Sequence, residues 1–113
     1  MIQAEAPPGP LRPAAALFRS LADPARLAIV RHLTASPARV VDLTRELGLA
    51  QSTVSGHLAC LRDCGLVSAQ AVGRASVYSL AQPALSGVLA AAEDVLAATG
   101  NAVALCPVYG QPR

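Results

Sequence analysis

The stretch from Gln51 to Gly65 reads Gln-Ser-Thr-Val-Ser-Gly-His-Leu-Ala-Cys-Leu-Arg-Asp-Cys-Gly, and its pattern predicts one amphipathic helix. At 3.6 residues per turn, Val54, Leu58 and Leu61 fall on a single apolar stripe that can be buried. Gly65 stands where a glycine commonly ends a helix, because glycine adopts the left-handed conformation without strain.

The two ends of this predicted helix differ in chemistry. The side chains of the first turn and a half are short and polar, and the second half carries two thiols, Cys60 and Cys64. Residues four apart lie on the same side of a helix, so the two thiols are expected side by side. A polar end that can read DNA and a thiol pair on the same helix together suggest a switch, in which the thiols control DNA binding.

Two helices are expected before this stretch, followed by a third that leads into it. The first spans residues 13–21. The second starts at Asp23-Pro24, an N-cap followed by a proline at the first helical position, and runs to about Leu33. Its side chains are expected to divide into a buried set, Leu27, Val30 and Leu33, and an outer set, Arg26 and Arg31. The third covers residues 40–47 and is ended by Gly48, and its short connection to the next helix predicts a helix-turn-helix.

The pattern after Gly65 changes from helical to extended. Residues 66–71 and 76–80 are expected to form a two-stranded hairpin, or wing, with Gly73 in its turn and Arg74 at its tip. A long helix from Pro83 to about Thr99 carries more apolar surface than this small domain needs. We therefore expect that helix to pack against its copy in a homodimer. The fold class is mainly α with a small β-hairpin.

Length and composition limit the number of domains and the class of protein. With 113 residues and 53% apolar residues, one domain is expected, divided into a disordered arm (1–12), a winged helix-turn-helix domain (13–99) and a tail (100–113). The net charge is only +2, and all nine basic residues are Arg. No apolar run approaches the ~20 residues of a membrane span, and the amino terminus does not resemble a signal peptide, so a cytoplasmic protein is expected.

Three segments resemble the ArsR/SmtB family of metalloregulatory repressors: residues 21–30, 49–58 and 61–67. The resemblance covers about residues 14–98. It implies a homodimeric winged helix-turn-helix repressor that binds a double-stranded operator and leaves it when a metal ion binds. Gly56 departs from the longer polar residue usual at its position, which could cost a contact to DNA.

Within the family, a thiol pair on the recognition helix and a third thiol in the tail resemble the CmtR-type cadmium- and lead-responsive repressors. Carried across, the metal ligands are Cys60, Cys64 and Cys106. Thiolates suit large soft ions, so Cd²⁺ or Pb²⁺ is the expected inducer, with As(III) also possible. Two other family sites are missing, because residues 40–42 lack thiols and the long helix has Glu93 and Asp94 but no His.

The DNA contacts are expected from the start of the recognition helix, which in such folds enters the major groove. The candidates are Gln51, Ser52, Thr53, Ser55, His57, Arg62 and Arg74. His57 is favoured as a packed or DNA-near histidine over a metal ligand.

Alternative interpretations remain open at this point. Cys60 and Cys64 could be small buried hydrophobic residues. The same fold could be a thiol redox sensor, although an i, i+4 pair on a helix strains disulfide geometry. It could also be a winged-helix module that binds proteins and not DNA. No paired carboxylates, nucleophile–base pair or phosphate-binding loop indicate an enzyme.

Overall fold

The computed structural model describes residues 9–101 and residue 105. Its elements follow one another along the chain as α1 (Leu11–Leu21), α2 (Pro24–Ala35), β1 (Ala38–Arg39), α3 (Val40–Leu47), α4 (Gln51–Asp63), β2 (Val67–Val72), β3 (Ala75–Leu80) and α5 (Leu85–Ala98). None of the helices in the described part is both long and apolar enough to cross a bilayer.

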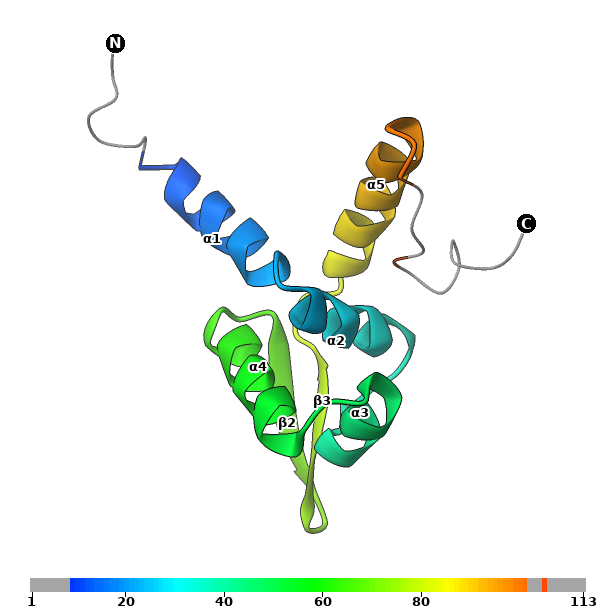
Figure 1. Cartoon of the computed structure of the whole chain (residues 1–113). Helices are drawn as coiled ribbons and strands as arrows, with labels where there is room; N and C mark the ends of the chain where they lie inside the picture. The colour runs from blue at the N-terminus through cyan, green and yellow to red at the C-terminus, as the bar shows by residue number, and fades with distance from the viewer. Residues whose placement is uncertain (1–8, 102–104, 106–113) are drawn as a thin grey trace.

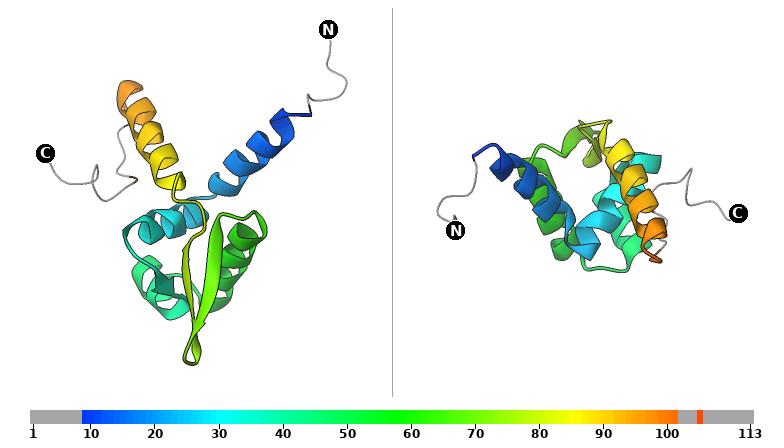
Figure 2. Two further views of the ribbon diagram at one scale, coloured as in Figure 1. Left: turned by 180° about the vertical axis from the view of Figure 1, so that it is seen from behind. Right: turned by 90° about the horizontal axis from the view of Figure 1, so that it is seen from above.

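The lower half of the molecule is a helical layer on a small sheet, and its upper half is a V formed by α1 and α5 (Figure 1). Figure 2 shows the same division from behind and from above, with α4 on the side of α1 and away from α5. The hairpin of β2 and β3 projects downward from the sheet as the wing. The predicted fold class, mainly α with a hairpin, is confirmed.

The sheet has three antiparallel strands in the order β1-β3-β2, one more than expected. The hairpin pairs Val67 with Leu80 and Val72 with Ala75, which leaves Gly73 and Arg74 as its turn. Gly73 has φ 62°, a conformation that glycine adopts without strain. The additional strand is two residues long and pairs Ala38 with Tyr78.

The core lies where α2, α3, α4 and the sheet meet. Val54, Leu58 and Leu61 are all fully buried, so the predicted stripe of α4 is confirmed. The fully buried set also contains Ile29, Val30, Leu43 and Leu89. Burying such side chains contributes about 1.5–3 kcal/mol each, which fixes α4 to the domain along its whole length.

Several expectations about boundaries and burial need correction. The first helix begins at Leu11, two residues earlier than expected, and α2 continues to Ala35. Leu27 is only half-buried, because it lines the groove between the arms of the V. Arg26, expected outside, is half-buried because its guanidinium turns back onto the end of α1.

Candidate DNA-reading and thiol site

The amino-terminal end of α4 presents a row of exposed polar side chains. These are Gln51, Ser52, Thr53 and Ser55. They surround Val54, whose complete burial fixes the helix beneath them. The chain enters α4 from α3 through Gly48, whose φ of 68° allows the tight turn of a helix-turn-helix. The arrangement leaves hydrogen-bonding groups free to meet the edges of bases in a major groove.

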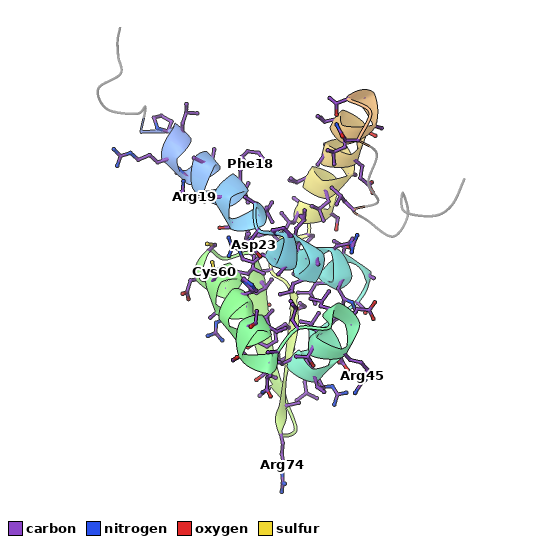
Figure 3. The ribbon with its side chains drawn as sticks, in the orientation of Figure 1. Phe18, Arg19, Asp23, Arg45, Cys60 and Arg74 are labelled. Carbon is purple, nitrogen blue, oxygen red and sulfur yellow. The ribbon has the colours of Figure 1, made fainter. Side chains whose placement is uncertain are left out.

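Two arginines flank this polar end. Arg74 lies at the tip of the wing, as predicted, and Arg45 projects from the last turn of α3 at the same lower end of the molecule (Figure 3). The side chain of Arg45 is 74% exposed. Sequence reasoning missed Arg45, although its place in the first helix of the helix-turn-helix was available as a signal.

A local ion pair organises the start of α3. Arg39 donates its backbone N–H and its guanidinium to the Asp42 carboxylate, with the guanidinium 3.1 Å from Oδ1. The side-chain hydrogen bond from Arg39 lowers the pKa of Asp42, and the same bond raises the pKa of Arg39. Asp42 therefore stays ionised in the first turn of α3, where the free N–H groups of a helix favour negative charge.

The carboxy-terminal half of α4 is joined to the preceding helices. His57 Nε2 lies 3.7 Å from Asp23 Oδ2, and Cys64 Sγ lies 2.9 Å from Ser20 Oγ. Asp23 also caps α2 by accepting the N–H of Arg26, and this hydrogen bond is the main reason that the pKa of Asp23 is lowered. The predicted N-cap role of Asp23 is confirmed.

Arg26 completes this corner between α1, α2 and α4. Its Nε donates to the backbone oxygen of Ser20 at 2.7 Å, and its Nη2 donates to that of Arg19 at 3.3 Å. Both carbonyl groups belong to the last turn of α1, and that of Arg19 also accepts the N–H of Ala22. The contact fixes the angle at which α1 leaves the domain.

The thiols lie partly as expected. Cys60 is half-buried and lies in the second half of α4, and Cys64 is exposed and forms the C-cap of that helix. Cys106 lies outside the described residues. Within those residues, no group of three or more His, Cys, Asp or Glu side chains could hold a metal ion. Two free thiols therefore fit one edge of a soft-metal site, and any further ligand must come from elsewhere.

Two of the predicted DNA contacts lie away from the exposed polar end. His57 has a side chain only 22% exposed and faces Asp23. Arg62 is exposed but belongs to the last turn of α4, about 16 Å along the axis from Gln51 at 1.5 Å per residue. The roles assigned to these two side chains stay predictions.

Leu105, next to Cys106 in the chain, is anchored between α2 and α5. Its side chain is buried, and it lines pockets with Leu27 and Ala28 of α2. Its backbone N–H donates to the carboxylate of Glu93, a residue of α5 that is itself only 7% exposed. Leu105 is thus docked on the side of the domain that carries α5.

The fold and this site together define a winged helix-turn-helix regulator. Residues 23–69 match the family model described as bacterial regulatory protein, arsR family. The crystal structure of Rv0081 from M. tuberculosis superposes with a TM-score of 0.77 and 35% identity, over 82% of this chain and 94% of that one. The protein belongs to the ArsR family, and its resemblance to that family is confirmed.

Two further relatives bear on function. The HTH-type transcriptional regulator CmtR of Mycobacterium tuberculosis is 47% identical over 64 residues, 57% of this chain and 54% of that protein. A homodimeric winged helix-turn-helix DNA-binding domain, Mb0332 from Mycobacterium bovis, superposes with a TM-score of 0.72 and 25% identity over 86% of this chain and 90% of that one. The chain spans about half the length of the curated relatives it matches. These relatives are DNA-binding regulators and not enzymes, in agreement with the sequence.

Proposed function

We propose that the protein is a transcriptional repressor that binds operator DNA as a homodimer and releases it when a soft metal ion binds its thiols. The observation that carries this proposal is the division of α4 between an exposed polar end and a half that carries Cys60 and Cys64. Such a protein would act in the cytoplasm, where operator DNA is found.

The groove between the arms of the V supports the dimer. It has a volume of about 630 Å³ and an almost wholly apolar lining contributed by α1, α2, α5 and Leu105. Phe18 and Val95 on its two arms are each 62% exposed. Apolar surface of this kind marks an interaction site, and a second copy of α1 and α5 would cover it. The homodimeric state of the relative Mb0332 supports a dimer.

For the metal site, we propose the thiolates of Cys60, Cys64 and Cys106 as ligands of Cd²⁺ or Pb²⁺, with As(III) as a further candidate. The support is the pair of free thiols on α4 and the similarity to CmtR. Because Leu105 is docked beside α5 whereas Cys64 contacts α1, we propose that Cys106 reaches the thiol pair of the other protomer.

Metal binding and operator binding would then be thermodynamically linked. If the metal-bound arrangement fits DNA poorly, metal and operator weaken each other by the same factor, typically ~1–3 kcal/mol. In this scheme Gln51 and its polar neighbours read bases, and Arg74 and Arg45 contact phosphates.

The experiment is a cadmium titration of the reduced protein bound to DNA from upstream of its own gene. Release should follow the thiolate-to-metal absorbance. Cys106→Ser should retain operator binding and lose metal-driven release, whereas unchanged release would exclude the tail as a ligand. Release by an oxidant and not by cadmium would favour the redox sensor, and no salt-dependent binding to a palindrome would favour a protein-binding module.

A further inference from the structure

Ser20 and Cys64 form a side-chain bridge between α1 and the end of α4. Ser20 is the last buried polar side chain of α1, with 6% of its surface exposed, and its Oγ lies 2.9 Å from the sulfur of Cys64. A buried hydroxyl at this position would cost free energy if it had no partner. The contacts of Ser20 supply such partners.

The direction of this hydrogen bond follows from the single hydrogen of a hydroxyl group. Ser20 Oγ donates that hydrogen to the backbone oxygen of Ala16, 3.0 Å away in its own helix. Ser20 can then only accept from Cys64, so the thiol is the donor. The backbone oxygen of Ser20 also accepts a hydrogen bond from Arg26 of α2. Ser20 is therefore the residue at which α1, α2 and the end of α4 are joined.

We propose that Ser20 is a positioning residue that joins the metal-free Cys64 to α1 and thereby couples the thiol site to the V. This inference rests on the proposed function and adds the route by which the signal travels. An ion bound at the sulfur would take the place of its hydrogen, so Cys64 could no longer donate to Ser20. The end of α1 would then lose this hydrogen bond to the recognition helix, and α1 lines the groove assigned to the second copy.

A purely structural Ser20 would only fill space, and a double-mutant cycle in the metal-free protein distinguishes the two roles. Ser20→Ala and Cys64→Ala should each weaken operator binding by about threefold, and the double variant should be no weaker than either single one, because contacting residues couple. Thr34→Ala is the matched control, since the Thr34 hydroxyl donates within its own helix, to the backbone oxygen of Arg31. That control should keep the operator affinity of the parent protein. Effects of Ser20→Ala and Cys64→Ala that multiply independently would overturn the proposal.

A second measurement needs no variant and separates this inference from the proposed function. On cadmium addition, hydrogen exchange of amides in residues 17–21 should become faster by about threefold or more, while amides of α3 stay unchanged. Protection of residues 17–21 that does not change in a fully cadmium-loaded dimer would overturn the role of Ser20. Failure of cadmium to release the operator would instead overturn the proposed function, while the metal-free cycle would still decide the role of Ser20.

Discussion

The two ends of α4 belong to one helix but differ in their surroundings. At the amino-terminal end, Gln51 and its polar neighbours are exposed. At the other end, His57 faces Asp23 and Cys64 is hydrogen-bonded to Ser20. The buried stripe between them prevents one end from moving without the other. The amino-terminal end is therefore available to a partner, whereas the carboxy-terminal end is connected to the rest of the molecule.

The largest expected effect is on stability and comes from removing a buried side chain of α4. Leu58→Ala removes a fully buried side chain from the middle of α4 and should lower the free energy of unfolding by about 2–5 kcal/mol. Denaturant unfolding measures the loss. The exposed Ser55→Ala is the control and should stay within about 0.5 kcal/mol of the parent protein. Equal losses in both variants would contradict the buried stripe.

The next effect isolates the exposed end. Gln51→Ala should weaken operator binding by about 1–3 kcal/mol and relax discrimination at one base pair, since a bidentate contact is lost. Binding of an operator library by fluorescence anisotropy measures both. Cadmium affinity of the free protein should not change, because Gln51 is far from the thiols along the helix. Uniform weakening across all sequences would assign Gln51 to the DNA backbone and not to a base.

A smaller effect concerns the two arginines beside that end. Arg45→Ala and Arg74→Ala should each reduce the slope of log affinity against log salt by about 1, because each removes one phosphate contact. Arg12→Ala on α1, at the opposite end of the molecule, is the control and should leave the slope unchanged. If the slope were insensitive to Arg45, α3 would not reach the DNA backbone.

The smallest effect tests the connected end by pH. The pKa of Asp23 is lowered in the folded protein from a usual value of 3.8, mainly by the N–H of Arg26. Its stabilising contribution is therefore complete above about pH 4 and is lost as the pH falls through the lower folded pKa. Asp23→Ala should flatten the acid side of the stability curve, measured by thermal unfolding. If Asp23→Ala lost stability at acid pH as steeply as the parent protein does, the Asp23 cap would not contribute to the pH dependence of stability.

Sequence periodicity predicted the parts of the molecule that depend on local pattern. The α4 stripe, the Asp23 cap and the Gly73 turn were all correct, because burial period, capping and positive φ are properties of short segments. The strand at Ala38 was missed, since two residues carry no periodic signal and their partners, Val77 and Tyr78, are distant in the sequence.

The connections of the site were beyond the reach of local pattern. Ser20 and Cys64 are 44 positions apart, so only the tertiary fold brings their side chains together. Arg26 was expected to face solvent because a charged side chain on a helix usually does, but its Nε donates to the backbone oxygen of Ser20 at the end of α1. The same limit explains why the anchoring of Leu105 by Glu93 could not be anticipated.

The most direct measurement is cadmium titration of the reduced dimer on its operator, with thiolate-to-metal absorbance and DNA anisotropy recorded in the same sample. We predict that absorbance rises as the DNA is released, and that added operator weakens cadmium binding by the same factor. A protein whose thiols are saturated with cadmium while it holds the operator as tightly as the metal-free form would contradict the account.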